Sequence, residues 1–203
     1  MLDAVRSDIF RQRKRLMPTV LLVIFALIAC ALYVVPWIAE KAQGDEMNLR
    51  DLLDLRASLW IQNVIPYGLQ FQSFFGLVLT AVLAGSSVGG EFSSGTVRTI
   101  IIRTRARWHF VAAKLTTIAL FALLLPTLGM TLHLALAAAM TRDVGGNFDD
   151  VFTFAYAGDL ATAVLRAFWC LLTYATLVVL LGVWTRSTAV AIAGSIGALF
   201  LEP

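Results

Sequence analysis

The hydrophobic residues of this chain gather in long runs that shorter polar segments separate. Four runs contain no formally charged residue, at residues 16–39, 67–90, 115–141 and 167–185. A helix that crosses the hydrocarbon core of a bilayer needs about 20 predominantly apolar residues. The pattern therefore predicts four transmembrane helices, over about residues 17–39, 67–90, 115–140 and 163–185.

A fifth apolar run, residues 187–203, follows Arg186 and reaches the end of the sequence. It is short for a span, and Glu202 lies beside its end. We therefore expect an all-α membrane protein, a polytopic helical bundle with four clear transmembrane helices and a fifth at the C-terminal end. We also expect the chain to be truncated inside or just after that fifth helix.

Composition supports this class. Hydrophobic residues make up 59% of the chain and charged residues 14%, whereas soluble domains carry about 25% charged residues. Cys30 and Cys170 lie inside apolar runs, where a small buried side chain is a better interpretation than a disulfide or a metal ligand. We expect no metal site and no nucleic-acid partner.

The first 16 residues form a basic segment ahead of the transmembrane domain, residues 17–203. Its apolar residues recur at helical spacing and are Leu2, Val5, Ile9 and Leu16. Its basic residues, on or beside the other face, are Arg6, Arg11, Arg13, Lys14 and Arg15. A basic amphipathic helix of this kind lies in the interface of an anionic leaflet. A frayed basic tail is the alternative for its first turn.

The distribution of basic residues predicts the orientation. Eleven of the sixteen Lys and Arg lie in the N-terminal segment, in residues 91–114 or at Arg186. Because cytoplasmic loops carry an excess of Lys and Arg, we expect the N-terminus and residues 91–114 in the cytoplasm. The loops 40–63 and 141–159 are then outside. Within the first of them, Asn48 and Asp51 predict the start of a short surface helix whose apolar face holds Leu49, Leu52, Leu53, Leu59 and Trp60.

Residues 91–114, hereafter the basic loop, are longer than a simple connection between two spans requires. In their middle lies a short apolar run, Val97 to Ile102, which Gly95 and Thr96 precede. Gly95 allows a sharp turn, and Thr96 is a suitable N-cap for a helix over the apolar run. The sequence therefore predicts a short helix held at the cytoplasmic face.

This short helix has the composition of a docking surface. Its apolar face consists of Val97, Ile100 and Ile101, and the basic residues around it are Arg98, Arg103 and Arg107. Such arginines can pair with acidic groups of a partner. Alternatively, the bases only set the orientation and bind anionic lipids, and Glu91 only makes a local pair with Arg98 or Lys114.

The segment around the start of the basic loop resembles a known family. Its residues are Gly90-Glu91-Phe92-Ser93-Ser94-Gly95-Thr96, followed by Arg98, the isoleucines, the bases up to Arg107, and Lys114. They are similar to ABC-2 type permeases, the membrane subunits of ATP-binding-cassette exporters, and most closely to the bacterial peptide-antibiotic resistance branch. In that family a Glu followed by Gly-Thr leads into a coupling helix, which docks on a separate ATPase subunit.

The resemblance implies a function and a location. The chain would be a permease subunit that moves substrate out of a bacterial cell across the plasma membrane, powered by an ATPase docked on residues 91–107. Glu91, Gly95 and Thr96 would form the junction between span and coupling helix. Members usually have six spans, so the chain would be part of such a domain. The alternative function is a membrane anchor or assembly protein that recruits a cytoplasmic partner without transport.

Small residues in the second predicted span indicate close helix packing. Ala81, Gly85 and Gly89 follow one another at intervals of four residues, a spacing that lets helix backbones approach. Because one subunit offers little room for a substrate path, we expect two copies, or this chain and a paralogous permease, to assemble through faces of this kind. Packing within one subunit is the alternative.

The sequence argues against catalysis by the chain itself. No Walker A pattern occurs, so we expect ATP and Mg²⁺ on the partner subunit and no cofactor on this chain. Residues 85–89 match G-x-S-x-G, but Ser87 and His133 are expected about 20 Å apart in depth, too far for a hydrogen bond. Helix packing is the better interpretation of this match.

Overall fold

The computed structural model describes residues 10, 16–43, 48–93, 108–143, 148 and 153–201. Their regular structure is entirely helical, which confirms the predicted fold class. The helices are α2 (Leu16–Gln43), α3 (Leu49–Leu59), α4 (Val64–Phe71), α5 (Leu77–Ser93), α7 (Trp108–Asp143), α8 (Phe154–Thr185) and α9 (Thr188–Leu201). A 3₁₀ turn, η1 (Ile61–Asn63), precedes α4, and a π-helical turn, η2 (Gln72–Gly76), joins α4 to α5.

Among the described residues, four stretches of helix are long and apolar enough to cross a membrane, as predicted. They are Leu16–Ala42, Ile61–Phe92, Val111–Asp143 and Phe154–Thr185, and α9 adds a shorter apolar helix. Both α7 and α8 begin well before the charge-free runs from which their spans were predicted. The segment between them is accordingly shorter than the expected loop 141–159, because α7 continues to Asp143 and α8 begins at Phe154.

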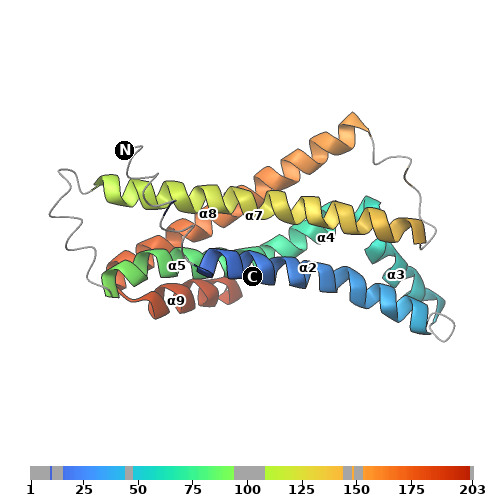
Figure 1. The fold of residues 1–203 in the computed structure, drawn as a ribbon, viewed down its shortest axis with the longest axis horizontal. Coiled ribbons are helices and arrows are strands. Elements are labelled where there is room, and N and C mark those ends of the chain that lie inside the picture. Colours follow the sequence, from blue (N-terminus) through green and yellow to red (C-terminus); the bar gives the residue numbers. More distant parts are fainter. Residues whose placement is uncertain are drawn as a thin grey trace.

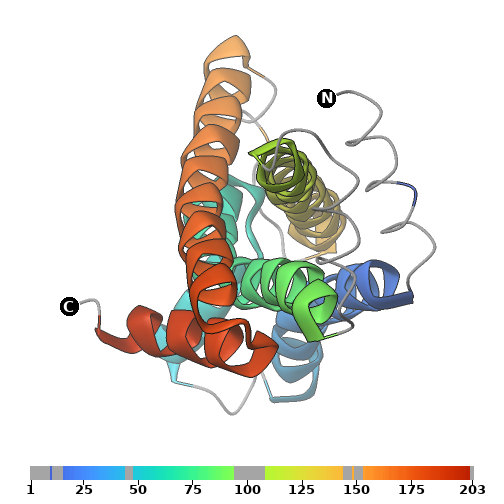
Figure 2. The same cartoon turned by 90° about the vertical axis from the view of Figure 1, so that its left-hand side faces the viewer.

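Helix α5 lies at the centre of the bundle. Viewed along the long axis, it has α8 and α9 on one side and α2 and α7 on the other (Figure 2). In the most apolar part of the second span 67% of the residues are buried, against 22% in the first span. The other spans therefore turn much of their apolar surface toward the surrounding lipid, while α5 contacts protein on most sides.

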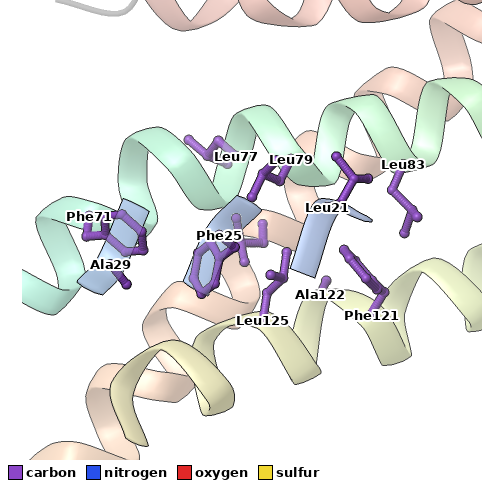
Figure 3. Packing of buried hydrophobic residues seen from close by; sticks show 11 residues of the cluster. Leu21, Phe25, Ala29, Phe71, Leu77, Leu79, Leu83, Phe121, Ala122 and Leu125 are labelled. Carbon is purple, nitrogen blue, oxygen red and sulfur yellow. The ribbon is translucent and has the colours of Figure 1, made fainter. Parts of the chain in front are cut away.

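One apolar cluster joins α2 to the other spans. Figure 3 shows side chains of α2 lying between the second span and α7. The buried members of this cluster include Leu21, Phe25, Ala29, Phe71, Leu77, Leu79, Leu83, Phe121, Ala122 and Leu125. Van der Waals packing of this kind drives association between helices inside a bilayer, where lipid tails are as apolar as leucine.

The small residues of α5 pack against the same chain. A Cβ atom on Gly85 would lie 2.5 Å from the Ile192 side chain, and one on Gly89 would lie 2.6 Å from the Thr188 Cα. Ala81 is buried in a cluster that also contains residues of α8 and α9. The face that we expected between two subunits is therefore covered by α8 and α9, because α9 folds back along α5 (Figure 1).

We expect Gly89→Ala to destabilise the bundle by about 1–3 kcal/mol, because the new methyl group meets the backbone of Thr188 and α9 must move away. Gly90→Ala is the matched control, since a Cβ atom there meets nothing within 4 Å. Thermal unfolding of the two variants in mild detergent measures the difference. Equal midpoints for Gly89→Ala and Gly90→Ala would contradict the close contact between α5 and α9.

Helix α3 closes the end of the bundle opposite to the C-terminal end of α5 (Figure 1). The Ile61 amide donates to Thr141 Oγ1 at 2.9 Å, and the Tyr156 hydroxyl donates to the Ile61 carbonyl at 3.1 Å. Arg56 pairs with Glu40 at 3.0 Å. These bonds tie α3 and η1 to α2, α7 and α8.

The surface helix predicted after Asn48 is confirmed, but its apolar face is narrower than expected. The N-cap is Asn48, whose side chain makes no capping hydrogen bond. Leu59 is fully buried, whereas Leu53 is half exposed. The helix therefore packs mainly through its C-terminal end.

The orientation can be tested by cysteine labelling in a background that lacks Cys30 and Cys170. Cysteines at Asn48, which is exposed on the α3 end, and at Asn147 should react with an impermeant thiol reagent from outside the cell. A cysteine at Ser94 should react only after the membrane is opened. The reverse labelling would place the basic loop outside and contradict a cytoplasmic partner.

Candidate functional site

A buried ion pair lies where the basic loop leaves and re-enters the bundle. Lys114 Nζ lies 2.7 Å from Glu91 Oε1, and the two side chains are 5% and 3% exposed. Glu91 belongs to the last turn of α5, which ends at Ser93, and Lys114 to the second turn of α7, which begins at Trp108. The two ends of the predicted loop, residues 91–93 and 108–114, are therefore helical, and the pair joins the two helices that flank its remaining part, residues 94–107.

The pair is part of the bundle interior. Partly buried Phe92 and Leu115, the neighbours of the two charged residues in the sequence, pack against a cluster that includes Val88 and Ile118. A charge-assisted contact of this length is among the stronger polar interactions. Because both charges have lost water, removal of either partner is strongly unfavourable. The ends of α5 and α7 are thus held together at one defined point.

A second contact holds the same end of α5. Two residues before Glu91, Gly89 lies against the start of α9 at Thr188. Helix α8 reaches α9 through a two-residue connection in which Arg186 adopts a left-handed conformation, with φ 52°. Helices α7, α8 and α9 therefore all meet α5 near this end.

The structure thus places Glu91 and the three small residues of α5, but the docking residues lie outside the part of the chain that it describes. These are Gly95, Thr96, Val97, Arg98, Ile100, Ile101, Arg103 and Arg107. The N-terminal amphipathic segment, apart from Phe10 and Leu16, also lies outside it. Of the two local partners considered for Glu91, Lys114 is the one observed in the described residues.

The residues of the G-x-S-x-G match show packing roles. The Ser87 hydroxyl donates to the Ala84 carbonyl at 2.9 Å within its own helix. The His133 ring contacts Tyr33 and Phe71, with Nδ1 2.8 Å from the Gly129 carbonyl. Within the described residues, no group of three or more His, Cys, Asp or Glu is placed to hold a metal ion.

Sequence reasoning missed a polar contact in the membrane-spanning region. Gln72, in the π-helical turn η2, is 2% exposed, and its Nε2 donates to the Leu125 carbonyl at 3.4 Å. The Gln72 amide lies over Gly129, where any Cβ atom would collide with it. The available signal was a pair of glutamines in a charge-free run, Gln70 and Gln72, together with a helix that contains Pro126 and Gly129.

The hydroxyls of two threonines near Pro126 donate to carbonyls of their own helix, neither of which is the carbonyl four residues before the proline. Proline removes the hydrogen bond to the carbonyl four residues before it, here that of Ala122. The Thr127 hydroxyl instead donates to the Leu123 carbonyl, and that of Thr131 donates to the Thr127 carbonyl at 2.9 Å.

In the part of the chain that the structure describes, four helical stretches of membrane length, one of which contains the central α5, define a multi-pass helical membrane protein. Residues 56–201 match the model of a family described as a protein of unknown function, DUF2705, and the chain belongs to that family. The match includes α5, α7, the basic loop between them and the Glu91–Lys114 pair. Comparisons with curated proteins and with solved structures gave no significant match.

Proposed function

We propose that the chain is the permease subunit of an ABC exporter, driven by a separate ATPase that docks on residues 91–107. The observation that carries the proposal is the buried Glu91–Lys114 pair, which ties together the two helices flanking the basic loop. The resemblance of residues 90–98 to the ABC-2 type permeases supports the same assignment. The membrane is the bacterial plasma membrane, with the N-terminus in the cytoplasm.

In this proposal, Val97, Ile100 and Ile101 bind an apolar groove of the ATPase, and Arg98 and Arg103 pair with acids at its edge. An apolar centre with a charged edge is typical of interfaces between proteins that must separate or move. ATP and Mg²⁺ bind to the ATPase. The chain itself then supplies the path and the moving helices.

The mechanism uses the central position of α5. When the ATPase moves on ATP binding, the docked helix moves with it and displaces the adjoining ends of α5 and α7. The Glu91–Lys114 pair makes the two ends move as one unit. Because α5 packs against α2, α7, α8 and α9, its tilt changes the packing of the whole bundle. A second copy or a paralogous permease completes the transport unit through a surface other than the α9-covered face of α5.

Ile101→Asp tests the docking site. We expect the variant to lose co-purification with the Walker-motif ATPase encoded nearest to it, because the substitution places a charge in an apolar contact. Ile101→Val is the control and should retain the ATPase. Both variants must be compared at equal abundance in the membrane.

Two results would contradict parts of this proposal. Unchanged ATPase binding in Ile101→Asp would move the docking site away from the apolar run. Binding of the ATPase without ATP-dependent export, measured as resistance to a panel of peptide antibiotics and as transport into inverted vesicles, would favour the membrane anchor.

A further inference from the structure

A cavity of about 430 Å³ lies beneath α3, on the flank that α2, α4 and η2 form. Its volume falls in the range of small-molecule sites, about 300–1,000 Å³. Its lining residues belong to α2, α3, α4, η2 and α7. Helix α3 lies at the end of the bundle opposite to the C-terminal end of α5, where Glu91 lies (Figure 1). The cavity is thus separate from the Glu91–Lys114 junction.

Exposed side chains line the opening of this cavity. Three of its lining residues, Leu32, Tyr67 and Phe74, are 47%, 41% and 44% exposed, and all three belong to membrane-length helices. Ser58 of α3 also lines the cavity. The cavity is therefore open on the side of the bundle, between exposed side chains of membrane-length helices.

The lining is suited to an uncharged chain. Phe71, Phe74 and Phe75 form a continuous wall in which neighbouring ring centroids lie 5.1 Å apart. This wall includes part of the π-helical turn, and such turns often occur at functional sites. Among the described residues that line the cavity, none carries a carboxylate, an ammonium or a guanidinium group.

The few polar groups have defined positions. The His133 ring is held by Phe71 at 4.9 Å, and its Nδ1 lies 2.8 Å from the Gly129 carbonyl. Two neutral polar side chains also belong to the lining, Ser58 from α3 and Gln70 from α4. From Tyr67 to Phe75 the helix rises about 12 Å, so the cavity is long as well as apolar.

We propose that this cavity binds the alkyl chain of a neutral, single-chain amphiphile taken from the surrounding membrane. The chain lies along Phe71, Phe74 and Phe75, and an uncharged polar headgroup lies near Ser58 and Gln70. An alkyl chain that fills the cavity makes dispersion contacts with the lining side chains, which these side chains lack when the cavity is empty. The site does not depend on the partner ATPase.

A photoreactive decyl glucoside, with a diazirine in its alkyl chain, tests the proposal in lipid nanodiscs. We expect saturable labelling of the peptide containing Phe71 to Phe75, detected by mass spectrometry, and competition by unlabelled decyl glucoside. Leu32→Trp narrows the opening and should reduce this labelling at least tenfold. Leu27→Trp is the matched control, since Leu27 is an exposed leucine of α2 that does not line the cavity, and its labelling should be unchanged.

Other outcomes overturn the proposal. Labelling that rises linearly with the probe and spreads over all lipid-facing helices would show contact with the surrounding lipid only. Undiminished labelling in Leu32→Trp would place the bound chain elsewhere. If Leu32→Trp fails to fold, Gln70→Trp fills the opening from α4 and must give the same loss of labelling.

Discussion

Glu91→Ala is expected to lower the free energy of unfolding by about 3–5 kcal/mol, the usual effect of removing one partner of a buried ion pair. The side chains of both partners are almost fully buried, at 3% and 5% exposure. Loss of the carboxylate therefore leaves the Lys114 ammonium inside the bundle without this neighbour. Lys114→Met should have an effect of similar size, because it leaves the Glu91 carboxylate there instead.

Two controls separate this effect from general damage. The double variant Glu91→Gln/Lys114→Met removes both charges and keeps the side-chain volumes, so it should recover most of the lost stability. Lys41→Met removes an exposed pair with Asp143, whose atoms lie 3.1 Å apart, and should change stability little. Steric trapping in bicelles measures the free energies. A double variant as unstable as Glu91→Ala would show that the charges themselves are not the cause.

The same double variant should abolish transport while it leaves the ATPase bound. The proposed docking residues, Val97 to Arg107, are intact in this variant, so the partner retains its site. What it loses is the ion pair between the ends of α5 and α7, through which we propose that the two ends move together. Neutral side chains of the same size fill the space but transmit a displacement less faithfully, because no charge-assisted contact fixes their relative positions.

Conservative variants refine this second prediction. Glu91→Asp keeps the charge but shortens the side chain by one methylene group, so it should retain part of the transport. Gly90→Ala changes the neighbouring residue without new contacts and should retain all of it. Equal loss of transport in Glu91→Asp, Gly90→Ala and the double variant would show that any change at the end of α5 stops transport. The ion pair would then have no specific role in coupling.

The four spans could be predicted from the sequence because the thickness of a bilayer sets a minimum apolar length. The helix ends could not. Lys114 marked a boundary in the sequence, yet α7 begins at Trp108 and includes Lys114, whose charge is paired with that of Glu91. The sequence offered Arg98 and Lys114 as local partners of Glu91, and a count of charges along the chain could not choose between them.

The sequence predicted that another helix packs closely against α5, but it did not predict which helix this is. The spacing of Ala81, Gly85 and Gly89 indicated a close approach by another helix. That helix is α9 of the same chain, with α8 beside it. Small residues indicate that a neighbouring helix can approach closely, but they do not indicate whether that helix belongs to the same subunit.

The contact of Gln72 with α7 could not be predicted either, because its partners are distant in the sequence. Its amide is satisfied in part by the Leu125 carbonyl and fits because position 129 is a glycine. Both partners lie more than 50 residues away in the sequence. The π-helical turn that presents Gln72 has no clear local signature, so neither the turn nor its contact could be read from periodicity.

The most direct test of coupling through the Glu91–Lys114 pair measures two quantities in the same membrane vesicles. These are the amount of ATPase co-purified per chain and the ATP-driven transport, for the wild type and for Glu91→Gln/Lys114→Met at equal abundance. We predict the wild-type amount of ATPase and no transport in the variant. Wild-type transport in that variant would contradict the account, because the helices flanking the basic loop would then move together without the pair.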